Sequence, residues 1–147
     1  MFSIDERILN SSVFVCESRL STVLVKNDNR FPWLLLVPRV EGVQEITQLS
    51  PKQQRVLMEE IDLFSRVLQA SREPDKLNIG ALGNMVSQLH IHIVARFKTD
   101  IAWPHSVWQP LVDSCSYEPQ TLEIFIERLK EQITCLSKSA YLPSFPK

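Results

Sequence analysis

The sequence has few cysteines, no surplus of charge and no long apolar run. Its three cysteines, Cys16, Cys115 and Cys135, are scattered and form no CxxC pair. They indicate neither a disulfide framework nor a zinc knuckle, and they suit a reducing compartment. The formal net charge of −1 gives no reason to expect general affinity for nucleic acid. The longest strongly apolar run, residues 33–37, is far too short to cross a bilayer.

The first residues also lack the features of a targeting segment. Residues 1–7 carry acidic charge early and contain no apolar stretch, whereas a signal peptide places basic charge before an apolar core. The sequence shows no internal repeat and no low-complexity tract. We therefore expect a soluble cytoplasmic protein that binds neither membranes nor nucleic acid.

The hydrophobic content is ordinary, at 44% of 147 residues, which suits one domain with a proper core. Apolar patterns predict strands over 12–17, 20–26, 32–38, 76–82 and 88–97. Helical spacing predicts a long helix over 53–70, capped by Ser50 with Pro51 in its first turn, and a second helix over 119–136. The last two strands are close enough in sequence to form an antiparallel hairpin. The sum is an α+β plan, with one long helix over a face of an antiparallel sheet.

The most informative segment is QLHIHIV, residues 88–94, which holds two of the three histidines. Alternate side chains of a strand point to the same face, so Gln88, His90 and His92 are predicted to line a polar face. Imidazoles titrate near neutral pH and can provide a nucleophile, an acid and an anion contact. A histidine nucleophile needs an acceptor at its other ring nitrogen, and a strand offers backbone carbonyls for this purpose.

The pattern by itself leaves three interpretations open. An isolated His-x-His can be an incidental surface pair. It can also chelate zinc with a third ligand such as His105 or Asp100, although the surrounding Asn, Ser and Gln residues are poor zinc ligands. The third interpretation is attack on phosphorus, which needs alignment and charge stabilisation. Amides of a Gly83-Asn84 turn would supply neutral donors for it.

The segment resembles the motif of the histidine-triad (HIT) superfamily, His-φ-His-φ-His-φ-φ, where φ is apolar. The resemblance runs from residue 12 to about residue 104 and is closest to a bacterial branch with Gln-Leu-His-x-His, followed here by Ala-Arg-Phe at 95–97 and Trp-Pro at 103–104. It implies a HIT-like sheet of about five strands in a domain over 1–110, with a C-terminal helical extension over 111–147 packed on that domain. It also implies a homodimer, built by the long helix and the strand over 78–82.

The resemblance assigns roles by motif position. His90 is the nucleophile that attacks the α-phosphate of a nucleotide, and His92 contacts the phosphate or the departing group. Gln88 stands at the first triad position, where an amide keeps an orienting role but no acid–base role. The implied ribose contact falls at Asn27 or Asp28, of which Asp28 is preferred, and the implied phosphate contacts are Asn78, Gly83 and Asn84. Trp33 replaces a fourth family histidine, and its aromatic face suits stacking on a base.

Two functions follow from this assignment. The first is a nucleotide phosphohydrolase or nucleotidyl transferase that acts on a phosphoramidate or a dinucleoside polyphosphate through a nucleotidyl-histidine, without a metal or cofactor. The second is a nucleotide-binding relative whose catalysis is weak or lost, serving as a sensor or partner protein. The missing histidines at positions 88 and 33 favour the second function, and the retained His90 favours the first.

Overall fold

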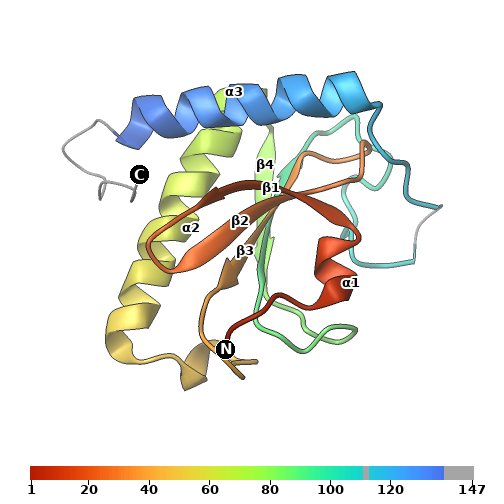
Figure 1. Cartoon of the computed structure of the whole chain (residues 1–147). Coiled ribbons are helices and arrows are strands. Elements are labelled where there is room, and N and C mark those ends of the chain that lie inside the picture. Colours follow the sequence, from red (N-terminus) through yellow and green to blue (C-terminus); the bar gives the residue numbers. More distant parts are fainter. Residues whose placement is uncertain (111–112, 138–147) are drawn as a thin grey trace.

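The computed structural model describes residues 1–110 and 113–137 (Figure 1). Its centre is a five-stranded antiparallel sheet in the order β1-β2-β3-β5-β4. This confirms the predicted α+β class and the antiparallel pairing of the last two strands. The strands are β1 (Ser12–Glu17), β2 (Ser21–Lys26), β3 (Trp33–Pro38), β4 (Lys76–Gly80) and β5 (Ile91–Arg96).

The long helix α2 (Pro51–Arg72) begins where the sequence predicts. The Ser50 hydroxyl accepts a hydrogen bond from the Gln53 amide, and the Gln53 side chain accepts one from the Ser50 amide. This reciprocal capping box satisfies backbone donors that the first turn leaves unpaired. The helix ends at Arg72, and the left-handed conformation of the C-cap residue Glu73 (φ 50°) turns the chain toward β4.

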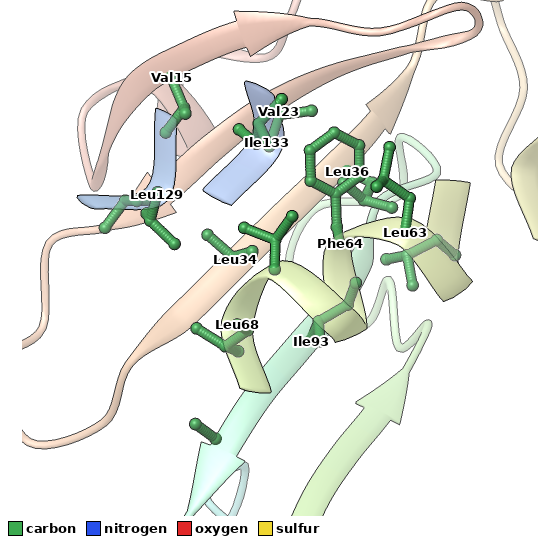
Figure 2. Packing of buried hydrophobic residues seen from close by; sticks show 14 of the residues in the cluster. Val15, Val23, Leu34, Leu36, Leu63, Phe64, Leu68, Ile93, Leu129 and Ile133 are labelled. Atoms are coloured by element: carbon green, nitrogen blue, oxygen red, sulfur yellow. The ribbon is translucent and has the colours of Figure 1, made fainter. Parts of the chain in front are cut away.

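The helices α2 and α3 (Pro119–Ser137) both cover one face of the sheet (Figure 1). Alternate residues of the central strands, such as Leu34 and Ile93, meet Phe64 of α2, and Leu129 of α3 packs in the same cluster (Figure 2). The apolar stripe of α3 is thus buried in the main core. The predicted division at residue 110 stays a prediction, and residues 111–112 and 138–147 of the extension lie outside the described residues.

The opposite face of the sheet carries a second apolar cluster. The other set of alternating strand residues, including Trp33, Leu35 and Val94, packs there against Ile8 and Val107. The short helix α1 (Glu6–Leu9) and the loop after β5 therefore cover this face where no long helix lies. Because His92 is two residues from Val94 on β5, it shares this thinly covered face.

The structure corrects the predicted bounds of the last two strands. β4 ends at Gly80 and β5 begins at Ile91, so residues 81–90 form a loop. Gly83 in this loop has a φ of +73°, which only glycine adopts without strain. The sequence also gave no periodic signal for α1 or for the one-turn helix η1 (Ile46–Gln48), which are too short to show one. No helix in the described part of the chain is long and apolar enough to span a membrane.

Candidate active site

His90 and His92 line one cavity of about 430 Å³ on the thinly covered face. Residues from α1, β2, β3, the 82–86 loop and the loop after β5 complete its walls. Apolar and aromatic side chains dominate, as is usual for a small-molecule site. The lining residues are Arg7, Ile8, Ser11, Lys26, Trp33, Leu35, Leu82, Gly83, Asn84, Met85, Val86, His90, His92 and Trp108.

A backbone carbonyl fixes the tautomer of His90. Its Nδ1 lies 2.7 Å from the carbonyl oxygen of Gln88. Because a carbonyl oxygen only accepts hydrogen bonds, the neutral ring must carry its proton on Nδ1. The lone pair then resides on Nε2, which bonds to none of the described residues. This is the state that a histidine nucleophile requires.

His92 is held in the opposite tautomer. The indole Nε1–H of Trp33 donates to His92 Nδ1 at 2.9 Å, so the proton of the neutral ring is on Nε2. Burial, followed by the nearby charges of His90 and Lys26, lowers the pKa of His92 from 6.5 to about 3. His92 is therefore a neutral N–H donor at ordinary pH. The two imidazole rings meet edge to face, with centroids 4.8 Å apart.

Two tryptophans surround His92. Trp33 is buried in the floor of the cavity, and Trp108 meets the His92 ring edge-on with centroids 5.6 Å apart. Gly80 leaves room for Trp108, because a Cβ at this position would lie 3.2 Å from the indole. Base stacking by Trp33 stays a prediction. The structure adds a role that the sequence did not reveal, namely the hydrogen bond to His92.

The side chain of Gln88 does not share a face with the histidines. Its Oε1 accepts from the amide of Asp5 at 2.9 Å, and its Nε2 donates to the carbonyl of Ser3 at 2.8 Å. The predicted alternation fails here because β5 begins only at Ile91. The Gln88 side chain instead secures the N-terminal segment along a separate shallow cleft.

The turn residues Gly83 and Asn84 do reach the cavity, as expected. Arg7 fixes this loop to α1, since its Nη1 donates to the carbonyl of Met85 at 3.0 Å while its other nitrogens bond to Asp5. Arg7 thus ties the loop that lines one wall of the cavity to the start of α1. Contact of Gly83 and Asn84 with phosphate stays a prediction.

Asp28 and Asn78 are engaged elsewhere. Both oxygens of the buried Asp28 accept from Arg30, at 2.9 and 2.7 Å. Asn78 Oδ1 accepts from Arg96, which also pairs with Asp100 at 2.8 Å. Neither side chain lines the cavity, since Asp28 is held by an ion pair and Asn78 by a hydrogen bond. The arginine two residues after Asp28 was the signal for the first of these contacts. The predicted contacts to ribose and phosphate find no support in this arrangement.

The zinc interpretation needs a third metal ligand close to His90 and His92. No group of three histidine, cysteine or acidic side chains placed to hold a metal exists within residues 1–110 and 113–137. Asp100 is already bonded to Arg96.

Sequence reasoning missed Lys26 as a cavity residue. It ends β2 and lines the cavity, with its Nζ 5.1 Å from the centre of the Trp33 ring. Burial lowers the pKa of Lys26. A lysine at a strand end is usually solvated, and only the register of β2 on β3 shows that it lies beside Trp33.

The site therefore consists of a His-x-His pair that faces a cavity on the thinly covered side of an antiparallel sheet. Comparison with known proteins shows which family shares this arrangement. The HIT domain family matches residues 9–99, and the chain belongs to this family. No curated protein matches it. Histidine triad proteins of known structure are similar to it. The protein from Bradyrhizobium japonicum is 42% identical with a TM-score of 0.87, covering 90% of this chain and 98% of its own. The histidine triad protein from Marinobacter aquaeolei is 38% identical with a TM-score of 0.88, and the match covers 92% of this chain and 98% of that protein.

Proposed function

We propose that this protein is a HIT-type nucleotide hydrolase or nucleotidyl transferase in which His90 attacks the α-phosphorus of a nucleotide. The observation that carries the proposal is the 2.7 Å contact between His90 Nδ1 and the Gln88 carbonyl. It leaves the lone pair on Nε2 of a side chain that lines the cavity. Such pre-set geometry lowers the cost of reaching the transition state.

The reaction divides into two displacements. In the first, the Nε2 lone pair forms a bond to phosphorus while the bond to the leaving group breaks, and the leaving group takes that electron pair. The imidazole becomes cationic, and its Nδ1–H donates more strongly to the Gln88 carbonyl. In the second, water attacks phosphorus and releases a proton, the P–N bond breaks, and His90 recovers its lone pair.

His92 supports both displacements as a donor. Its Nε2–H is the free donor of a ring that stays neutral, and it lies beside the His90 ring. A donor placed against a phosphoryl oxygen stabilises the charge that builds up in the transition state. With a pKa of about 3, His92 does not serve as a general acid at neutral pH.

One observation also favours the second function, a nucleotide sensor with weak turnover. The Gln88 side chain is turned toward Ser3 and Asp5. The His92 ring is neutral at pH 7 and so is not a general acid. Within the described lining, neither histidine is then left to donate a proton, because His90 is the proposed nucleophile and His92 stays neutral. A leaving group that needs protonation, such as an amine, should depart slowly.

The decisive experiment traps the covalent intermediate. The protein is incubated with adenosine 5′-phosphorimidazolide, quenched in base and analysed by peptide mass spectrometry. We expect an acid-labile, base-stable adenylate on His90 and none in His90→Ala. His105→Ala is the matched control, because His105 is the exposed third histidine. An adenylate that persists in His90→Ala, or no adenylate on the wild type, would refute the assigned nucleophile.

A further inference from the structure

Lys26 stands in a row of side chains that crosses the cavity floor. Its Nζ lies 5.1 Å from the centre of the Trp33 ring. The Trp33 ring centroid is 5.6 Å from that of His92, and the His92 centroid is 4.8 Å from that of His90. The row follows β2, β3 and β5, which are neighbours in the sheet. Two strand spacings, roughly 10 Å, therefore separate the strand of Lys26 from that of His92.

The ammonium group of Lys26 has no ion pair with any residue in the described ranges. Asp28, two residues away, already gives both oxygens to Arg30. Arg7 is the other cation that lines the cavity, and its guanidinium donates to the Asp5 carboxylate and to the Met85 carbonyl. Lys26 thus brings to the cavity a positive charge that has no direct anionic partner in the described ranges.

The rest of the lining also selects for anions. Among the described residues that line the cavity, none is an aspartate or glutamate. Burial without an anionic partner disfavours a charged lysine, and the lowered pKa of Lys26 agrees with this. Packing on the Trp33 ring compensates for this burial only in part, since a cation–π contact does not replace an anionic partner.

We propose that Lys26 binds a second phosphoryl group of the substrate, across the cavity floor from the phosphorus that His90 attacks. The inference rests on the proposed function and narrows it to nucleotides that carry at least two phosphoryl groups. The second group belongs either to a polyphosphate chain or to a phosphate on the sugar. Both present the same chemistry to an ammonium group.

Binding measurements test this without turnover. Isothermal titration calorimetry compares adenosine monophosphate, adenosine diphosphate and adenosine 3′,5′-bisphosphate. We expect one of the two bisphosphorylated ligands to bind the wild type about tenfold more tightly than the monophosphate, as one charge-assisted contact provides. Lys26→Met should lose this advantage, and Lys26→Arg should keep it. Lys52→Met is the matched control, because it removes the same charge from an exposed position in the first turn of α2.

Each result of these titrations supports or contradicts the proposed role of Lys26. An advantage confined to the diphosphate assigns the second group to a polyphosphate chain, and one confined to the 3′,5′-bisphosphate assigns it to the sugar. If Lys26→Met weakens all three ligands by the same factor, or weakens none, the inference is wrong while the proposed function stands. If no nucleotide binds the wild type, both the inference and the proposed function fail.

Discussion

His90 and His92 hold opposite tautomers, and two different neighbours set them. A backbone carbonyl accepts from Nδ1 of His90, whereas an indole N–H donates to Nδ1 of His92. The result is a lone pair on one ring beside a donor on the other. Residue types and spacing suggest two similar histidines, and only the hydrogen bonds show that they differ.

Trp33→Phe should release the tautomer of His92. Without the indole donor, Nδ1 loses its partner, and the proton is free to reside on either nitrogen. ¹⁵N chemical shifts of the His92 ring should change from the Nε2–H form toward a mixture, and any turnover should fall about tenfold, as expected for one lost hydrogen bond. Trp108→Phe is the control, since Trp108 meets the same ring without bonding to it. Unchanged ring shifts in Trp33→Phe would contradict the assignment.

The pKa of His92 links stability to pH. Its value is about 3 in the folded protein, against an ordinary 6.5, so between these values the unfolded chain binds a proton that the folded protein does not. The free energy of unfolding should therefore fall as pH decreases from 6.5 toward 3. His92→Asn should lessen this fall in urea titrations at pH 7 and pH 4. The same substitution at the exposed His105 should leave it unchanged, and equal slopes for wild type and His92→Asn would oppose the prediction.

At the scale of elements, Asp100 organises the loop that closes the cavity side of the sheet. Its carboxylate accepts from the Arg96 guanidinium and from the backbone amides of Phe97, Ala102 and Trp103. The Arg96 and Asp100 side chains are only 1% and 4% exposed. This loop carries Val107 and Trp108 to the thinly covered face, so its order bears on the site.

Asp100→Asn should destabilise the protein strongly. It leaves the buried Arg96 without its charge partner, which costs about 3–5 kcal/mol of the free energy of unfolding. Asp62→Asn provides the comparison, because Asp62 pairs with Arg66 at the same four-residue spacing on an exposed helix face. That change should cost no more than about 0.5 kcal/mol. Chemical denaturation measures both, and similar losses would contradict the argument.

The elements that the sequence predicts well are those with long periodic patterns or strong caps, such as α2 with Ser50 and Pro51. The His-x-His pair could be recognised because the chain has only three histidines and two of them lie in this segment. The partner of Asn78 and the position of Lys26 depend on which strands are neighbours and on their register, which the sequence does not show. The pairing of Asp28 with Arg30 is local and could have been predicted. Gln88 was misplaced because alternation holds only within a strand, and nothing local marks where β5 begins.

At the scale of the whole molecule, the predicted homodimer and the cytoplasmic location remain proposals. β4 is an edge strand of the described sheet, and Ile79 on it is 47% exposed, with Leu82 just beyond it also exposed. Exposed apolar edge strands invite pairing with another chain. A twofold partner along β4 would extend the sheet and cover these side chains.

Ile79→Lys should therefore shift the protein from dimer to monomer in light scattering at micromolar concentration, because it places a charge in the expected interface. Ile124→Lys is the control on α3, where an isoleucine is similarly exposed. A wild type that is already monomeric would refute the dimer and leave the fold untouched.

The carbonyl that sets the His90 tautomer has a consequence for substitutions at position 88. Every amino acid has this oxygen, so the backbone can hold the His90 ring in the same orientation whichever side chain occupies position 88. The Gln88 side chain bonds instead to the N-terminal segment, at Ser3 and Asp5. A change of that side chain is therefore expected to disturb the N-terminal segment before it disturbs His90.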